Sequence, residues 1–411
     1  MTDTNINLED KANFSSPLGA RDLYDFDEII DRHNTGAVKI ERCKALYGTD
    51  DVLPLWVADM DFRTPDFIIE AIRERCEHPI LGYSMPPKEF YPTVIEWISE
   101  HHQWNIDRQW IGFLPGIVPG LSFSVQSLTS PGDEVIVQPP VYYPFFHVIK
   151  NNNRVLVNNP LKTVNGKFEM DFEDLEQKIT SKTKLFILCS PHNPGGKVWN
   201  AESLKRLAEI CSKHNITVVS DEIHADMVLE GYKHIPFATV SEEAAKISLT
   251  FMAPSKTFNM PGLISSSYII TNKEIRTKFV DFLESSELTG GNIFAYAATV
   301  AAFEKGNDWR KQMLEYVQGN IDFVVDFLKT NIPQITPMIP EASFLVWLNC
   351  QELGMETDDL FDFFAQKAGL GLNKGTIFGP GGEYHLRLNV ACPRSILQKA
   401  MKQLKDAVTA P

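Results

Sequence analysis

Short apolar runs alternate along this chain with longer amphipathic segments, and the alternation limits the fold more than any other feature. The runs include residues 185–188, 216–219 and 247–252. Continuous apolar runs of this length are typical of buried parallel strands, and the amphipathic segments between them are typical of helices that cover both faces of a sheet. The pattern therefore predicts an α/β fold whose large domain contains a mostly parallel sheet.

The pattern changes after Pro333, where strands and helices of a second kind follow. Residues 343–348 alternate like a half-buried strand, and residues 385–390 indicate another strand. These segments predict a smaller α+β domain, to which N-terminal residues also contribute. We expect a loose arm at residues 1–20. The expected parts are residues 1–65 (N-terminal arm and part of the small domain), 66–305 (large domain) and 306–411 (C-terminal small domain).

Composition excludes several classes of protein. A net charge of -14 argues against nucleic acid or an anionic membrane as the main partner. The 6 cysteines show no CxxC spacing, so neither a metal site nor a disulfide framework is indicated, and free thiols suit the cytoplasm. Residues 1–13 do not resemble a signal peptide, and the longest apolar run, 293–303, is too short for a bilayer span and predicts a buried helix.

Polar side chains follow three of the predicted strands. Asn193 comes after the strand at 185–188, Asp221 after 216–219, and Lys256 after 247–252. A lysine at the end of a buried strand is costly unless it has a role, and a desolvated amine can form a Schiff base with an aldehyde cofactor. The carboxylate of Asp221, at the end of the strand at 216–219, can pair with a protonated pyridine nitrogen.

Each of these residues also has a purely structural interpretation. Lys256 could be a surface lysine in a loop, and Asp221 a helix cap or half of a buried ion pair. Asn193 belongs to an Asn-Pro-Gly-Gly sequence, which forms a turn by itself.

Three further segments are candidates for binding a flat, phosphorylated ring and an amino acid. The turn at 116–120 precedes a predicted helix, whose N-terminus could bind phosphate together with the Ser255 hydroxyl. Tyr142 could stack on the ring, although the pattern does not distinguish it from Tyr143. Arg387 lies inside an apolar strand and could bind a substrate carboxylate, unless it sits on an edge strand and faces solvent.

Taken together, these segments resemble the pyridoxal-phosphate-dependent carbon–sulfur β-lyases of the MalY/PatB type. This family has the fold of type I pyridoxal-phosphate enzymes and is related to class I and II aminotransferases. The resemblance covers roughly residues 24–405 in the order of the family. The matching segments are 55–62, 82–84, 140–142, 190–194, 220–226, 253–259 and 386–394.

The resemblance implies pyridoxal 5'-phosphate as cofactor and a homodimer with shared active sites. It further implies that Tyr83 reaches the phosphate and the substrate in the neighbouring subunit. The roles that it implies within one subunit are Lys256 for cofactor attachment and proton transfer, Asp221 for the pyridine nitrogen, Asn193 for the ring oxygen, Tyr142 for stacking, Ser255 with the backbone of Ile117 and Val118 for phosphate, and Arg387 for the substrate carboxylate.

Two positions depart from typical aminotransferases and favour the lyases. His224, which the resemblance implies is a cofactor-binding residue, stands three residues after Asp221, where many aminotransferases have a tyrosine. Ile264 stands eight residues after Lys256, where many have an arginine that binds phosphate. The expected reaction is α,β-elimination from cystathionine or another cysteine S-conjugate, which gives a thiol, pyruvate and ammonia. The alternatives are an aminotransferase, or a regulatory domain that binds the cofactor without turnover.

Overall fold

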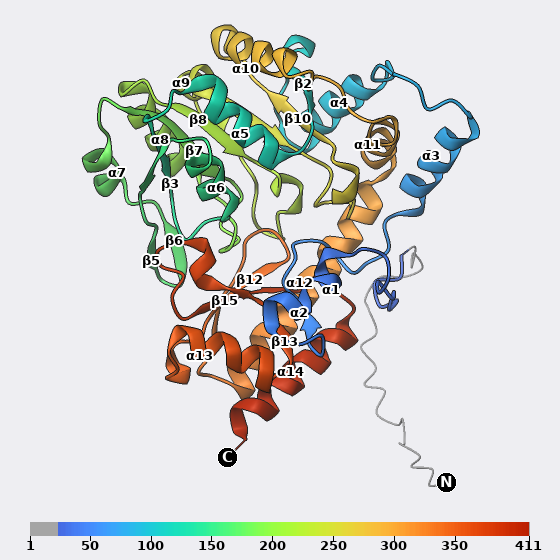
Figure 1. Ribbon diagram of the computed structural model, residues 1–411, viewed down its shortest axis with the longest axis vertical. Helices are drawn as coiled ribbons and strands as arrows, with labels where there is room; N and C mark the ends of the chain where they lie inside the picture. The colour runs from blue at the N-terminus through green and yellow to red at the C-terminus, as the bar shows by residue number, and fades with distance from the viewer. Residues whose placement is uncertain (1–23, 411) are drawn as a thin grey trace.

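A computed structural model describes residues 24–410 and places the two largest sheets in two regions of the chain (Figure 1). The larger sheet has 7 strands, and all neighbouring pairs are parallel except those that involve β10. In spatial order the strands are β2 (Ile111–Leu114), β10 (Ser266–Ile269), β9 (Ser248–Met252), β8 (Thr217–Asp221), β7 (Thr183–Cys189), β3 (Glu134–Val137) and β4 (Val155–Asn158).

Side chains of the central strands alternate between the two faces of this sheet, as strand geometry requires. On β7, Leu185 and Ile187 pack in one apolar cluster, whereas Phe186 and Leu188 pack in another. Helices α5 (Ile117–Leu128), α6 (Pro144–Lys150) and α10 (Lys273–Ser285) cover the first face, and α8 (Ala201–Lys213), α9 (Glu242–Ile247) and α7 (Phe172–Lys178) cover the second. Each fully buried aliphatic side chain of this kind stabilises the fold by about 1.5–3 kcal/mol.

The smaller sheet has 4 antiparallel strands and packs against a long helix. Its strands in spatial order are β11 (Thr336–Met338), β12 (Leu345–Asn349), β15 (His385–Asn389) and β14 (Asn373–Lys374). Helices α12 (Asn307–Asn331) and α14 (Arg394–Thr409) share its apolar core. The N-terminal segment joins this region, because β1 (Leu53–Pro54) pairs with β13 (Leu370–Gly371).

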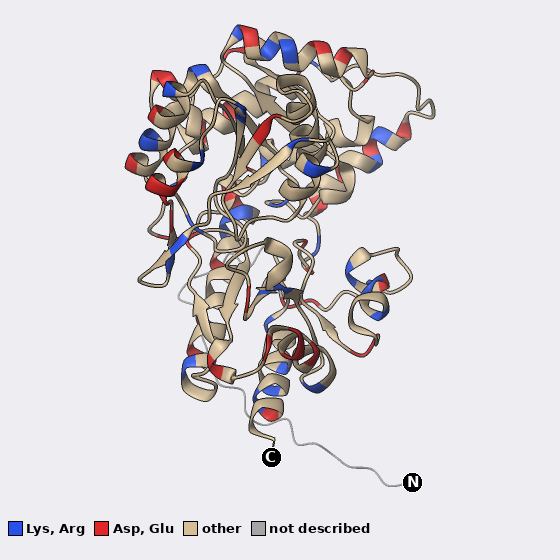
Figure 2. Cartoon of the chain, turned by 60° about the vertical axis from the view of Figure 1, so that its left-hand side comes forward, with Lys and Arg blue, Asp and Glu red and all other residues tan. Residues whose placement is uncertain are grey.

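Further helices flank these sheets. They are α1 (Val38–Glu41), α2 (Cys43–Tyr47), α3 (Asp66–Glu77), α4 (Phe90–His102), α11 (Ile293–Lys305) and α13 (Thr357–Asp362), with the hairpin β5 (Lys162–Val164) and β6 (Lys167–Glu169). Acidic and basic residues mix along the outer helices, whereas the strands carry few charges (Figure 2). Within residues 24–410, no helix has both the length and the apolar character that a membrane crossing needs.

The predicted architecture, a mostly parallel sheet with a smaller α+β region, is confirmed. The domain bounds at residues 65 and 305 stay our proposal, and the expected arm at residues 1–20 lies outside the described residues. The predicted helix at 293–303 corresponds to α11.

Candidate active site

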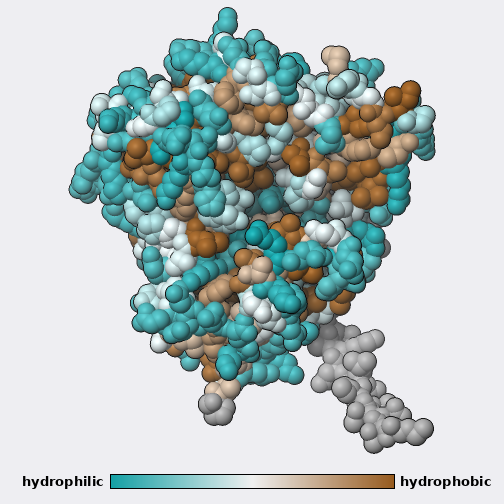
Figure 3. All heavy atoms as spheres, in the orientation of Figure 1, coloured by the Kyte–Doolittle hydropathy of each residue, from teal (hydrophilic) through white to brown (hydrophobic). Residues whose placement is uncertain are grey.

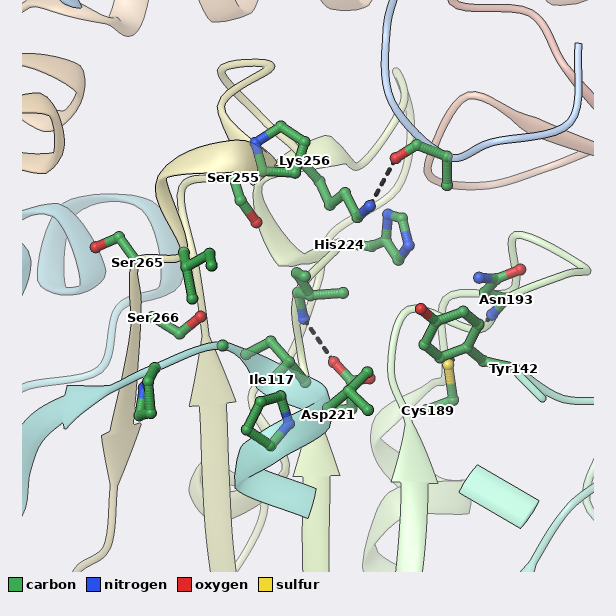
Figure 4. A pocket seen from close by; sticks show the side chains of 18 residues that line it. Ile117, Tyr142, Cys189, Asn193, Asp221, His224, Ser255, Lys256, Ser265 and Ser266 are labelled. Atoms are coloured by element: carbon green, nitrogen blue, oxygen red, sulfur yellow. Dashed lines mark hydrogen bonds between the residues drawn. The ribbon is translucent and has the colours of Figure 1, made fainter. Parts of the chain in front are cut away.

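A cavity of about 340 Å³ lies at the edge of the large sheet where the parallel strands end. This volume is at the lower end of the range of small-molecule sites. Because β7, β8 and β9 are parallel and adjacent, the segments that follow them meet at this edge, as predicted. The cavity is lined, among others, by Ile117, Val118, Tyr142, Asn193, Asp221, His224, Ser255 and Lys256 (Figure 4).

Lys256 extends into the cavity from the loop after β9, and its Nζ donates a hydrogen bond of 2.6 Å to the carbonyl oxygen of Ala58. Burial lowers the pKa of Lys256 to about 8, because desolvation penalises the charged amine. A substantial fraction of the amine is therefore neutral near pH 7–8, which is the form that can react with an aldehyde or accept a proton.

Asp221 is the last residue of β8 and lies on the cavity wall with 3% of its surface exposed. Its Oδ1 accepts one hydrogen bond, of 3.2 Å, from the Ile223 backbone, and no described residue pairs with it as a cation. Burial raises the pKa of Asp221 to about 7, since the charged form lacks a partner in a desolvated site. A cationic ring nitrogen would supply that partner.

His224 follows Asp221 by three residues and faces the same cavity near Lys256 (Figure 4). It is buried, and its Nδ1 finds no hydrogen-bond partner among the described residues. Burial lowers the pKa of His224 to about 3, and the nearby Lys256 and Arg387 charges act in the same direction. The imidazole is therefore neutral at physiological pH and retains hydrogen-bonding capacity toward the cavity.

The opposite end of the cavity is formed by the N-terminus of α5 and by hydroxyl groups. Gly116 precedes the helix with a φ of 98°, in the region that favours glycine, and leaves the first N–H groups of α5 directed outward. Ile117 and Val118 form the first turn there, and Ser255 is buried beside it. A helix N-terminus with an adjacent hydroxyl is suited to a phosphate group.

Asn193 and Arg387 are joined in the structure, although only Asn193 lines the cavity. The Arg387 Nη1 donates to the Asn193 Oδ1 at 3.0 Å, which leaves the amide N–H groups of Asn193 available. Arg387 has 3% of its surface exposed and has no carboxylate partner in the described part of the chain. Burial lowers the pKa of Arg387 to about 10. A buried cation without an anion is suited to a substrate carboxylate.

The two tyrosines left open above differ in where they lie. Tyr142 lines the cavity together with Asn193, whereas Tyr143 does not. Burial raises the pKa of the Tyr142 hydroxyl, so it is neutral at physiological pH. Tyr83 is the predicted residue that the structure does not bring near, because it lies fully exposed in the loop between α3 and α4 and lines no part of this cavity.

Several residues of the cavity were missed by sequence reasoning. Cys189 is the last residue of β7 and could have been found by the same strand-end argument that identified Asp221. Ser265 and Ser266 reach the cavity because β10 runs antiparallel, so its beginning lies where the parallel strands end. Ala58 comes from the N-terminal segment, and no local pattern places it here.

The residues present fit pyridoxal 5'-phosphate. Asp221 is a buried acid without a cation, which matches the ring nitrogen, and the α5 N-terminus with Ser255 matches the phosphate. Lys256 supplies an amine of lowered pKa in the same cavity. Pairing of a positive ring nitrogen with Asp221 would remove the cost of burying that charge.

Comparison with known proteins agrees with this geometry. Residues 50–404 match the family described as aminotransferase class I and II. The chain is 43% identical to cystathionine beta-lyase PatB of Bacillus subtilis, over 93% of this chain and 100% of that protein. It is 30% identical to protein MalY of Escherichia coli, over 94% of this chain and 100% of that protein.

A solved structure is similar over nearly the same length. Cystalysin from Treponema denticola, whose crystal structure contains a pyridoxal 5'-phosphate cofactor, superposes with a TM-score of 0.91 at 34% sequence identity. The match covers 94% of this chain and 98% of that one. The expected resemblance to MalY/PatB-type proteins and the fold of type I pyridoxal-phosphate enzymes are thereby confirmed.

Proposed function

This chain belongs to the aminotransferase class I and II family, and we propose from that premise that it cleaves cystathionine or another cysteine S-conjugate to a thiol, pyruvate and ammonia. It is a pyridoxal-phosphate-dependent C–S lyase of the cystathionine β-lyase type. The observation that carries the proposal is the convergence of Lys256 and Asp221 on one cavity, where a lysine of lowered pKa faces an acid that has no cationic partner among the described residues.

The cofactor is held, in this proposal, by groups at both ends of the cavity. The backbone of Ile117 and Val118 with the Ser255 hydroxyl binds the phosphate, and Asp221 binds the ring nitrogen. Asn193 and His224 would form hydrogen bonds with the ring oxygen, and Tyr142 would pack against the ring. The bound cofactor supplies an aldehyde for the substrate amine and a ring that withdraws electrons from the α-carbon.

The remaining chemistry belongs to the side chains of this chain. Arg387, fixed by Asn193, Asn373 and the Trp56 carbonyl, binds the substrate carboxylate and so orients the α-carbon. Lys256 takes the α-proton at Nζ, because its amine is partly neutral near pH 8. Asp221, at the end of β8, would stabilise positive charge at the ring nitrogen.

The first prediction separates a lyase from an aminotransferase. Purified protein loaded with cofactor and given cystathionine should release free thiol and pyruvate in equal amounts without any keto-acid acceptor. Thiol is measured with a disulfide reagent, and pyruvate with lactate dehydrogenase. Conversion that requires a keto acid and leaves the thioether intact would assign the chain to the aminotransferases instead. A yellow protein that does not convert cystathionine, with or without a keto acid, would indicate a cofactor-binding domain without turnover.

The loop around Tyr83 supports a homodimer with shared active sites. Ile80, Leu81 and Met85 in this loop have 67%, 63% and 86% of their surface exposed, and Tyr83 is fully exposed. Apolar surface also gathers at the upper right of Figure 3, where α3 and this loop lie. Because exposed apolar side chains seldom cluster on a monomer, we propose that a second copy covers them. Tyr83 would then contact the phosphate and the substrate in the partner subunit.

The second prediction tests this shared site by complementation. Tyr83→Ala and Lys256→Ala should each be inactive or nearly so, whereas mixed dimers of the two variants should recover activity, since one of their two sites is intact. Subunit exchange is followed by thiol release, and dimerisation by light scattering. Mixing Lys256→Ala with Asp221→Ala serves as the matched control, because both residues line the same cavity of one subunit. Recovery with the control pair, or none with the test pair, would contradict the shared site.

We also propose that the protein works in the cytoplasm. All 6 cysteines are free, and 5 of them are buried. Free thiols persist in reducing compartments.

A further inference from the structure

Four charged side chains form a compact cluster next to the active site. The Asp59 Oδ2 accepts from the Arg32 Nη2 at 2.6 Å, and the Asp61 Oδ1 accepts from the Arg32 Nη1 at 2.8 Å. The Lys39 Nζ lies 2.7 Å from the Asp61 Oδ2 and 3.7 Å from the Asp59 Oδ1. Lys39 is almost completely buried, at 1% exposure. The charges of two cations and two carboxylates therefore cancel in a partly desolvated cluster. Separating any of these ion pairs would leave a poorly solvated charge, so the cluster has a fixed geometry.

The backbone that carries Asp59 is held from two further sides. The Asn389 Nδ2 on β15 donates to the carbonyl oxygens of Val57 and Asp59 at 2.6 and 2.7 Å. Asn259, three residues after Lys256, accepts from the Met60 backbone N–H at 3.0 Å and donates to the Met60 carbonyl at 3.1 Å. The segment 57–60 is thus clamped between the small sheet and the lysine loop.

The clamped segment presents one carbonyl to the catalytic lysine. The Ala58 oxygen, adjacent in sequence to Asp59, accepts from the Lys256 Nζ at 2.6 Å (Figure 4). No other hydrogen bond of this amine is made within residues 24–410. A Lys256 amine that is not attached to the cofactor would therefore have a fixed acceptor at the wall of the cavity.

Asp59 is the member of the cluster whose charge is least satisfied. Its Oδ1 is buried and has no hydrogen-bond partner in the described part of the chain, since Lys39 is 3.7 Å away. Burial lowers the pKa of Lys256, and Asp59 opposes this shift more than any other charged group. The other charges that face Lys256 are Arg387 on β15, which lowers its pKa, and Asp221 on β8, which raises it. His224 faces the same amine and is neutral.

We propose that Asp59 is a positioning residue for Lys256, which holds the Ala58 carbonyl against the amine and supplies the negative charge that balances it when it is released from the cofactor. The inference rests on the proposed function, because only an enzyme whose lysine detaches and moves a proton needs such a site. Arg32 and Lys39 act through Asp59, since they fix its carboxylate and the segment around it.

The test measures the titration of Lys256 in the cofactor-free protein. Trace acetylation with acetic anhydride at a series of pH values, followed by peptide mapping, gives the pH at which the Lys256 amine is half reactive. Asp59→Asn keeps the shape of the side chain and removes its charge, so this midpoint should fall by about one unit, and labelling at pH 7 should rise several-fold. The acidic limb of the kcat/KM profile of the loaded enzyme should move in the same direction.

Asp61→Asn is the matched control. It removes a carboxylate from the same ion cluster, with the same two cationic partners, but Asp61 does not adjoin the carbonyl that binds Lys256. The Lys256 midpoint should therefore stay within a few tenths of a unit of the wild-type value, even where thermal unfolding shows a similar loss of stability. An equal shift in both variants, or none in Asp59→Asn, would overturn the proposal.

Arg32→Gln gives an independent result of the same sign, which is informative even if Asp59→Asn does not fold. It keeps the Asp59 carboxylate but removes the guanidinium that fixes it, so the Ala58 carbonyl should be held less firmly and the Lys256 midpoint should fall. A rise or no change would contradict the inference. Because the labelling needs neither cofactor nor turnover, its outcome is separate from that of the lyase assay. Shifts in labelling without thiol release from cystathionine would refute the proposed function, and they would still show that Asp59 governs the protonation of Lys256.

Discussion

Replacing Lys256 with alanine should reduce kcat/KM for thiol release from cystathionine by about 10⁴-fold or more. The variant loses both the amine that attaches the cofactor and the general base for the α-proton, and a positioned base alone contributes about 10²–10⁴-fold. The lowered pKa of Lys256, about 8, means that the wild-type amine is available for both tasks near neutral pH. Thiol and pyruvate assays measure the loss directly.

Covalent labelling distinguishes this role from a structural one. Borohydride reduction of the loaded wild-type protein should fix the cofactor on the peptide that contains Lys256, and the variant should lose that label. Lys273→Ala is the matched control, because Lys273 is an exposed lysine at the start of α10 and should change neither activity nor labelling. Partial recovery of Lys256→Ala by added methylamine would show that the missing function is that of an amine. Label on another lysine in the wild type would refute the assignment.

The convergence of Asn193, Asp221 and Lys256 was predictable from the sequence for a simple reason. Adjacent parallel strands end at one edge of a sheet, so residues that follow β7, β8 and β9 must lie close together whatever the details of packing. The same rule covered Cys189, which was overlooked because its thiol continues an apolar run.

Contacts between distant segments were beyond this rule. The contact of Ala58 with Lys256 depends in part on Asn389 and Asn259, which bind the N-terminal segment from positions hundreds of residues away. Ser265 required the direction of β10, which an apolar run does not reveal. The position of Tyr83 relative to a site depends on a second copy of the chain, and periodicity in one chain contains no information about that copy.

Replacing Asp221 with asparagine should lower kcat by about 10²–10³-fold, because the ring nitrogen loses the carboxylate that keeps it protonated. Asparagine keeps the Oδ1 acceptor for the Ile223 N–H, so the local turn should survive. Asp221→Glu, which restores a carboxylate at a displaced position, should recover part of the rate. The measurement is single-turnover thiol release, together with the absorption spectrum of the bound cofactor.

Asp221→Asn should lower kcat but raise the stability of the cofactor-free protein above neutral pH. Burial raises the pKa of Asp221 from 3.8 to about 7, so between these values the folded state binds a proton that the unfolded state does not. The free energy of unfolding therefore falls as pH rises through this window, by up to about 4 kcal/mol. Asp221→Asn does not titrate and should escape this loss. At pH 8 the cofactor-free variant should then be more stable than the wild type, as measured by denaturant unfolding.

Cofactor binding should reverse that order, and the reversal separates the two interpretations of Asp221. In the loaded wild type the cationic ring nitrogen compensates the buried carboxylate, whereas in the loaded variant it meets a neutral amide. Asp221→Asn should therefore bind the cofactor more weakly and gain less stability from it than the wild type. If Asp221 served only for capping or packing, its replacement would destabilise both the cofactor-free and the loaded protein. A carboxylate that destabilises the cofactor-free protein and stabilises the loaded protein has its role in binding the cofactor.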